Sequence, residues 1–221
     1  MRPPGPAAAL DALNARHPWS HNDHFHGWIL RRLPEHRRRA IDVGCGRGGL
    51  LARMAPHFDE VLGTDSDAEM RHRSAERCAG LPNVSVTGSP LSELSPGADL
   101  ITMVAVLHHL DLADALTRVS DLLDPGGRFL VVGLAPPATL HDQLWNLVSA
   151  VTNPVIGLVK HPRPDRSGRQ PPGFPVADPT VPFDEVRAHA ESLLPGATLT
   201  RRLAFRYTLE WTKPQRRHRT T

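Results

Sequence analysis

The stretch AIDVGCGRGGL, residues 40–50, decides the fold of this chain. A short apolar run leads into Gly44, Gly46 and Gly48, which alternate through a turn, and LLARM then resumes with helical character. A strand that ends in a glycine turn and opens a helix lets backbone approach a ligand closely, with the helix N-terminus pointing at it. Asp65 follows seventeen residues after the last of these glycines, where the next parallel strand is expected to end and ribose hydroxyls could be bound. These features together predict a site for a nucleoside cofactor.

The residues alone leave two alternatives for the identity of that nucleoside. Gly44, Gly46 and Gly49 also satisfy the G-x-G-x-x-G pattern of a dinucleotide site, so a nicotinamide-dependent oxidoreductase is one alternative. Asp42 stands two residues before the first glycine, where a pyrophosphate would gain nothing from a fixed negative charge. A carboxylate there suits a cofactor that carries an amino group and a sulfonium. The chain contains no G-x-x-x-x-G-K-[ST] string, so a P-loop is not supported.

Four motifs at regular spacing resemble the class I S-adenosylmethionine-dependent methyltransferases, in particular the ubiquinone-biosynthesis-like bacterial enzymes that act on small molecules. The resemblance extends from about residue 20 to residue 213. It implies S-adenosylmethionine as the cofactor and methyl transfer to O, N or C of a small organic molecule, in secondary metabolism. The motifs are D-x-G-x-G-x-G at Asp42 to Gly48, GTDSDAEM at 63–70, ADLITMVAVLHHLD at 98–111 and LLDPGGRFLVVG at 122–133.

Strand and helix patterns alternate along the chain, and the apolar runs ITMVAV and RFLVVGL lack the alternation of half-exposed strands. This predicts an α/β fold: a doubly wound, mostly parallel, seven-stranded Rossmann-like sheet with an antiparallel C-terminal edge hairpin. The expected strands are 40–43, 61–63, 84–87, 99–106, 128–134, 198–204 and 206–212. The expected helices are 22–33, 49–55, 68–79, 112–123, 139–151 and 183–194.

The chain is expected to form one methyltransferase domain over residues 10–213, between a disordered N-terminus at 1–9 and a basic tail at 214–221. Helix 22–33 is predicted to cap this domain. An insert at about 138–182 follows the fifth strand. Its Pro- and Gly-rich part, 161–182, is predicted to be a lid over the site or, alternatively, to be disordered.

The composition of the chain limits which binding partners and which cellular compartment are expected. No stretch approaches the roughly 20 apolar residues that span a bilayer, so no membrane partner is expected. Cys45 and Cys78, placed in a glycine turn and at a helix end, predict neither a disulfide nor a zinc site, and they fit a cytoplasmic location. The sequence pI is about 9.4, but the formal net charge is only +3 and the cations are clustered locally. Nucleic acid is therefore an unlikely partner by composition, although an RNA methyltransferase stays an alternative, and a monomer or homodimer is expected.

The cofactor-binding residues are assigned by position. Asp42 is expected to hold the cofactor's amino group or, alternatively, to cap the next helix, and Asp65 to bind both ribose hydroxyls or, alternatively, to cap the helix that starts near Asp67. Ser89 stands where the resembled family usually has an acid that contacts the adenine amino group. The resemblance completes the set with the backbone at Gly44, Cys45 and Gly46, with Ser66 and Met70 beside the adenine, with Pro90 and the Leu91 N–H after the third strand, and with Ala105.

His108 and His109 are the candidate general bases, since they follow the fourth strand beside the expected methyl group. Adjacent residues are expected to point apart, so at most one of the two should face the methyl group. His21 and His24, in HNDHFH, are second candidates at the rim of the site. This histidine cluster could bind a metal, but with 13 histidines in the chain some clustering is expected by chance, and no metal is predicted.

Overall fold

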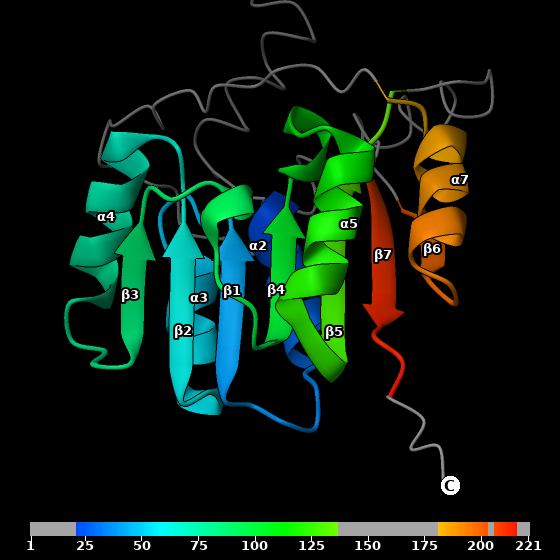
Figure 1. Cartoon of the computed structure of the whole chain (residues 1–221). Helices are drawn as coiled ribbons and strands as arrows, with labels where there is room; N and C mark the ends of the chain where they lie inside the picture. Colours follow the sequence, from blue (N-terminus) through cyan, green and yellow to red (C-terminus); the bar gives the residue numbers. More distant parts are fainter. Residues whose placement is uncertain (1–20, 137–180, 203–205, 216–221) are drawn as a thin grey trace, which may run out of the picture.

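The computed structural model describes residues 21–136, 181–202 and 206–215, with side chains from residue 25 onward. Its centre is a seven-stranded sheet in the order β3-β2-β1-β4-β5-β7-β6, in which β7 alone runs antiparallel to its neighbours (Figure 1). The predicted fold class is therefore confirmed, including the antiparallel hairpin at the C-terminal edge. The strands are β1 (Arg39–Val43), β2 (Glu60–Thr64), β3 (Val84–Thr87), β4 (Ala98–Val104), β5 (Leu123–Leu134), β6 (Thr198–Arg201) and β7 (Arg206–Thr212).

The strand order reverses direction between β1 and β4. From β1 the chain moves outward through β2 to β3 and then crosses back, so that Asp42 on β1 lies between Gly63 of β2 and Thr102 of β4. In open parallel sheets, ligands bind in the crevice outside the carboxyl ends of the strands at such a switch point. The topology thus places the expected site at the carboxyl ends of β1 and β4.

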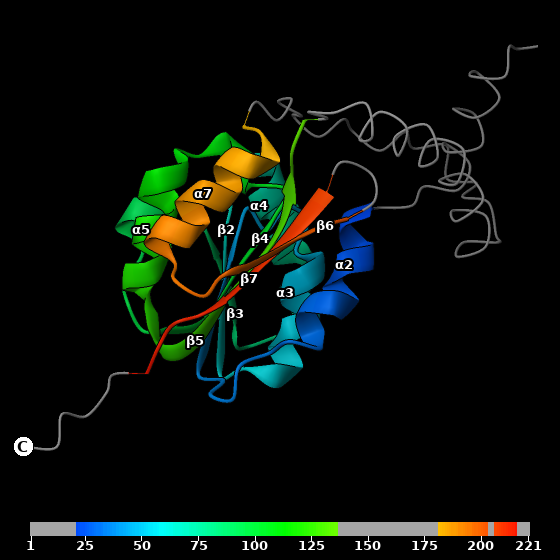
Figure 2. The same cartoon turned by 90° about the vertical axis from the view of Figure 1, so that its right-hand side faces the viewer.

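Helices cover both faces of the sheet. In Figure 2, α2 and α3 lie on one side and α5 and α7 on the other, and α4 packs against α3. The helices are α2 (His21–Leu30), α3 (Gly49–Met54), α4 (Ala68–Cys78), α5 (Leu112–Leu122) and α7 (Phe183–Leu193), with short 3₁₀ helices η1 (Ala55–His57), η2 (Leu91–Glu93) and η3 (Leu107–His109). In the described part of the chain, no helix is long and apolar enough to span a bilayer.

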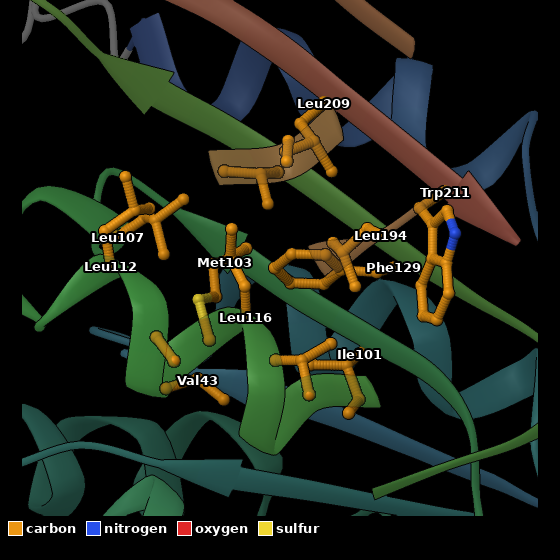
Figure 3. Close-up of a cluster of buried hydrophobic side chains, with 14 of the residues drawn as sticks. Val43, Ile101, Met103, Leu107, Leu112, Leu116, Phe129, Leu194, Leu209 and Trp211 are labelled. Atoms are coloured by element: carbon orange, nitrogen blue, oxygen red, sulfur yellow. The ribbon is translucent and has the colours of Figure 1, made fainter. Parts of the chain in front are cut away.

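Two apolar layers hold the sheet between its helices. The larger layer packs α5 and α7 against one face, where Leu116 meets Met103 and Ile101 of β4 and Phe129 of β5 (Figure 3). Strand β4 is buried from its first residue to its sixth, which explains why its sequence shows no alternation. The smaller layer packs α2 and α3 on the opposite face and includes Ile29 and Leu130.

Some predicted boundaries are wrong by two to five residues. Strand β5 begins at Leu123 rather than at residue 128, because Leu123 already pairs with Ala98 of β4. Helix α2 ends at Leu30 rather than at residue 33, because the chain tightens there into a turn in which the Arg32 amide bonds the Ile29 carbonyl at 2.8 Å. Strand β4 ends at Val104 rather than at residue 106, because Ala105 has a left-handed φ of 58°. Strand β6 ends at Arg201 rather than at residue 204. The expected N-terminal disorder, helix 139–151, nearly all of the lid and the end of the basic tail lie outside the described residues.

An ion pair between the exposed Arg38 and the buried Asp99 joins the amino ends of β1 and β4. The Asp99 carboxylate accepts bonds from the backbone N–H groups of Arg38 and Arg39, at 2.7 and 3.2 Å, and from the Arg38 guanidinium at 2.8 Å. Burial acts to raise the pKa of Asp99, but these hydrogen bonds outweigh it and hold the pKa below its usual range. The ion pair thus holds the two strands together at the end of the sheet opposite the expected site.

Gly133 tests how tightly the sheet is packed. It pairs with Tyr207 across β5 and β7, and a Cβ on Gly133 would overlap with the buried tyrosine ring. We expect Gly133→Ala to lower the free energy of unfolding by about 1–3 kcal/mol or more, because the ring must leave its place. Urea denaturation measures this change. Gly80→Ala is the control, since nothing lies within 4 Å of the position of its Cβ; an equal loss in both variants would contradict the packing argument.

Candidate functional site

The turn after β1 is built from three left-handed glycines. Gly44, Gly46 and Gly48 have φ values of 70°, 53° and 70°, a region that side-chain-bearing residues rarely adopt. The amides of Gly44 and Cys45 both donate to the Thr64 carbonyl at the end of β2, at 2.7 and 3.0 Å. A Cβ on Gly44 would overlap with Val106, whereas nothing lies within 4 Å of the Cβ position of Gly46. The turn is therefore packed by protein at Gly44 and open to a ligand at Gly46.

Asp65 ties this turn to the end of β2. One carboxylate oxygen accepts a 2.8 Å bond from the Gly46 amide, and the other accepts a 3.0 Å bond from the Asp67 amide. The helix cap is Asp67, whose carboxylate accepts bonds from the amides of Glu69 and Met70 at the start of α4. The alternative in which Asp65 caps this helix is thus not observed. Each Asp65 oxygen keeps a lone pair that can accept from a hydroxyl group.

Asp42 is a buried carboxyl beside the same turn. Its side chain is 3% exposed and accepts a 2.6 Å bond from the Thr102 hydroxyl of β4. Burial raises the pKa of Asp42 to about 7, the Thr102 bond opposes this shift, and the neighbouring Asp65 adds to it. The alternative in which Asp42 caps α3 is not observed, because Gly48 occupies the N-cap position. Binding of a cation at Asp42 would favour its ionised form.

Cys45 contributes its backbone to the turn and its side chain to the core. Its Sγ lies 3.7 Å from the hydroxyl oxygen of Ser74 on α4, in the smaller apolar layer. Burial raises the pKa of this thiol to about 12, and the charge of Asp42 adds to the shift, so the thiol is neutral at physiological pH. Its amide and carbonyl are both bonded within the turn region, to Thr64 and Gly48. Cys45 therefore shapes the turn through its packing.

The residues assigned to the adenine surround the carboxyl ends of β2 and β3. Met70 is buried at the start of α4, and Ser66 is exposed. The Ser89 hydroxyl lies 3.2 Å from that of Thr87, and the Ser89 carbonyl accepts a bond from the Thr64 hydroxyl. Pro90 is exposed and precedes η2, which Leu91 begins. The five residues assigned to the adenine thus follow the carboxyl ends of two neighbouring strands, and Thr64 joins Ser89 to the glycine turn.

Sequence analysis did not single out Thr64 or Thr102. Both are buried hydroxyl residues within strands that are otherwise apolar, and each bonds to a residue of the site. A threonine directly before the acid at a strand end, as in GTD, and a threonine opposite Asp42 in ITMVAV were the available signals. Neither signal can be read without the strand register, because the register decides which side chains meet.

A strained residue leads from β4 into the histidine pair. Among residues 21–136, 181–202 and 206–215, Ala105 is the one non-glycine residue with positive φ, at 58°. Its amide bonds the Val132 carbonyl at 2.8 Å, which holds this conformation in place. Conformations of this kind cost of the order of 1–3 kcal/mol and cluster at functional sites.

His108 and His109 follow in η3, at the carboxyl end of β4. Their ring centroids are 4.0 Å apart with an angle of 41° between the ring planes. The expectation that the two side chains point apart is therefore wrong, because within one 3₁₀ turn the rings lean together. His108 is half-buried and His109 exposed, which leaves His109 the more accessible of the two.

The other two candidate bases lie on α2, whose backbone alone is described at that end. The C-terminal side of α2 is held near the amino half of β5, where the Arg128 guanidinium donates to the Arg32 carbonyl at 2.7 Å. From there α2 runs along the sheet toward its carboxyl edge (Figure 2). His21 and His24 therefore begin the helix at the edge that carries the glycine turn, and their role as bases stays a prediction. Among the described side chains, no three His, Cys, Asp or Glu residues gather as a metal site.

Comparison with known proteins identifies the family. A model described as a methyltransferase domain matches residues 41–129, from β1 into β5. An uncharacterized methyltransferase of Mycobacterium tuberculosis is 32% identical over 201 residues, which cover 89% of this chain and 98% of the relative. A trans-aconitate 2-methyltransferase of Methylobacterium radiotolerans is 36% identical over 129 residues, or 56% of this chain and 47% of that protein.

A solved structure supports the same assignment at the level of the fold. A SAM-dependent methyltransferase from Aquifex aeolicus superposes with a TM-score of 0.56 at 15% identity, covering 93% of this chain and 97% of the other. The strand order also differs from the 3-2-1-4-5-6 order typical of dinucleotide-binding sheets, because the antiparallel β7 lies between β5 and β6. On the fold, the site geometry and these relatives, the chain belongs to the class I S-adenosylmethionine-dependent methyltransferases and is an enzyme whose cofactor is S-adenosylmethionine.

Proposed function

We propose that this enzyme transfers the methyl group to O, N or C of a small organic molecule. The observation that carries the proposal is the open face of Gly46, bounded by the Asp65 carboxylate, at the switch point of the sheet. The relative from Methylobacterium radiotolerans, whose name gives trans-aconitate as its substrate, supports a small acceptor. The cofactor supplies a methyl group that its sulfonium has already activated. The protein therefore has to bind the two reactants, align them and exclude water from them.

The residues present fit this cofactor. Asp65 would hold the ribose hydroxyls with its remaining lone pairs, and Asp42 would hold the amino group as an ionised carboxylate. The donors to both carboxylates in the structure are neutral N–H and O–H groups, which leaves their charge available to a cationic ligand. Gly44 and Gly46 let the backbone approach, and Met70 with Ser89 would line the adenine.

His109 would act as the general base where the acceptor must lose a proton. Alignment alone can supply roughly 7–11 kcal/mol of the barrier, so a base is needed only for a nucleophile that is protonated at working pH. His108 contacts the His109 ring and would hold it in position. The roles are divided in this way because the His109 ring is exposed to an acceptor and the His108 ring is half-buried.

Calorimetric titration of the purified full chain with S-adenosylhomocysteine, and separately with NADH, tests the cofactor site. We expect saturable binding of the nucleoside and none of NADH. Transfer of a radiolabelled methyl group to members of a small-molecule panel, but not to RNA, would then establish the acceptor class. Binding of NADH alone, or labelling of RNA alone, would overturn the proposal.

Asp65→Asn tests the ribose contact with little change of shape. We expect affinity for S-adenosylhomocysteine to fall by about 1.5–3 kcal/mol, the scale of a lost hydrogen bond to a charged group. Asp67→Asn is the matched control, because asparagine also caps helices well and the Asp67 side chain accepts its bonds from the first turn of α4. Calorimetry on both variants decides the role, and unchanged affinity in Asp65→Asn would remove Asp65 from the site.

The raised pKa of Asp42 predicts that cofactor affinity depends on pH. Below about pH 7 the carboxyl of the free enzyme is mostly protonated, so binding of an ammonium group must release a proton. Affinity for S-adenosylhomocysteine should therefore rise between pH 5.5 and 7.5, and the rise should be absent in Asp42→Asn. Calorimetric titrations in buffers of different ionisation enthalpy count the protons released.

The stability of the free enzyme should depend on pH in the opposite direction. The folded state binds more protons than the unfolded state between pH 4 and 7, so the free energy of unfolding falls as pH rises through that window.

His109→Gln separates catalysis from binding. We expect turnover of a protonated acceptor to fall about 10²–10⁴-fold, because the base is lost, while affinity for S-adenosylhomocysteine is kept. His57→Gln, at an exposed histidine of η1, serves as the control. Steady-state kinetics on acceptors found in the panel provides the measurement, and a wild-type rate in His109→Gln would show that the reaction needs no base from this residue.

A further inference from the structure

Arg206 lies at the carboxyl edge of the sheet, and none of the described residues forms an ion pair with its guanidinium. It begins β7 and pairs with Leu134, the last residue of β5. Its Nε and Nη1 atoms are buried and donate no hydrogen bond to any of the described residues. Burial lowers the pKa of Arg206 to about 10, which still leaves the group charged at physiological pH. A buried charge without a partner is costly, so such a group calls for a ligand.

The neighbours of Arg206 on β7 define the face on which it lies. Tyr207, Leu209 and Trp211 pack into the larger apolar layer toward α5 and α7. Side chains alternate along a strand, so Arg206 and Glu210 face the opposite side, along which α2 runs. Glu210 is bound there by two other guanidiniums, those of Arg32 and Arg128, and lies about 13 Å further along the strand. It cannot neutralise Arg206.

A second arginine lies on the same face of the sheet. The Arg202 amide bonds the Arg206 carbonyl at 2.7 Å, and Arg202 Nε donates to the Thr208 hydroxyl at 3.1 Å. Thr208 is two residues from Arg206 and therefore on the same face of β7. Two arginines, Arg202 exposed and Arg206 half-buried, thus belong to one face at this edge of the sheet.

We propose that Arg206, assisted by Arg202, binds a carboxylate of the methyl acceptor, and that the acceptor is therefore a small organic acid. This inference rests on the proposed function and names its substrate class. The planar fork of a guanidinium matches a carboxylate with two parallel hydrogen bonds. Strand β7 lies three positions from β1 in the sheet, or about 14 Å, so this anion site is separate from the glycine turn. The carboxylate of the cofactor is thus not its ligand.

Malonate, with malonamide as its neutral counterpart, probes the site without knowledge of the acceptor. The unfolding temperature of the full chain is followed at constant ionic strength, with and without S-adenosylhomocysteine, for wild type, Arg206→Gln and Arg187→Gln. The last variant is the control, because Arg187 is exposed and lies over the Phe183 ring on the other side of the sheet. We expect malonate, and not malonamide, to raise the unfolding temperature of wild type and control saturably, and Arg206→Gln not to respond. An equal response in Arg206→Gln, or no response in wild type, would overturn the proposal.

Kinetics distinguish the acceptor from the cofactor. For acids that the enzyme methylates, Arg206→Gln should raise KM at least tenfold, while its affinity for S-adenosylhomocysteine changes less than twofold. Arg206→Lys keeps the positive charge but loses the planar guanidinium, so its KM should lie between those of wild type and Arg206→Gln. A loss of nucleoside affinity in Arg206→Gln, or faster turnover of methyl esters than of the parent acids by wild type, would contradict the assignment. A wild type that binds no nucleoside would instead defeat the proposed function, and the malonate response would then stand alone.

Discussion

The hydrogen bond between the Gly46 amide and the Asp65 carboxylate holds the site together. It joins the turn after β1 to the residue after β2, over 2.8 Å, and it does so at the glycine whose outer face is open. The Thr64 carbonyl reinforces this join by accepting bonds from Gly44 and Cys45. Gly44 and Gly46 donate from backbone with left-handed φ, so the geometry requires glycine at these two positions. A carboxylate already oriented by two amides is also pre-organised to accept further hydrogen bonds.

Charge is distributed unevenly along the carboxyl edge of the sheet. The β1 and β2 side carries two carboxyls, Asp42 and Asp65, whose partners are neutral donors, and this suits a cofactor with a positive sulfur and ammonium. The β7 side carries Arg202 and Arg206. In the proposed function the cation and the anion bind at opposite ends of one crevice, and like charges are kept apart. At the amino edge, by contrast, opposite charges are paired with each other, since Asp99 forms an ion pair with Arg38.

Most of the fold could be predicted because its signals are local. The apolar runs of β4 and β5 and the glycine turn each report a backbone preference that neighbouring residues do not override. The errors fall where tertiary contacts decide the outcome. Strand β4 stops at Ala105 only because the bond to Val132 on β5 holds a left-handed alanine, a conformation that alanine does not favour by itself. The histidine rings lean together for a similar reason, since a 3₁₀ turn follows at once.

The sequence by itself determined the alternation of parallel strands and helices up to β5, the glycine turn and the two acids that face it, because each of these features has a local signal and glycine has few reasons to recur at every second position. The tertiary structure alone decided how those acids are used. Which aspartate caps α4, which hydroxyl supports Asp42 and which arginine finds no partner among the described residues all depend on register and burial. These arise between segments as far apart as 178 residues, as in the bond of Arg32 to Glu210. Desolvation is the physical reason, because the pKa of a charged group depends on its burial and on the charges and hydrogen-bond partners packed around it.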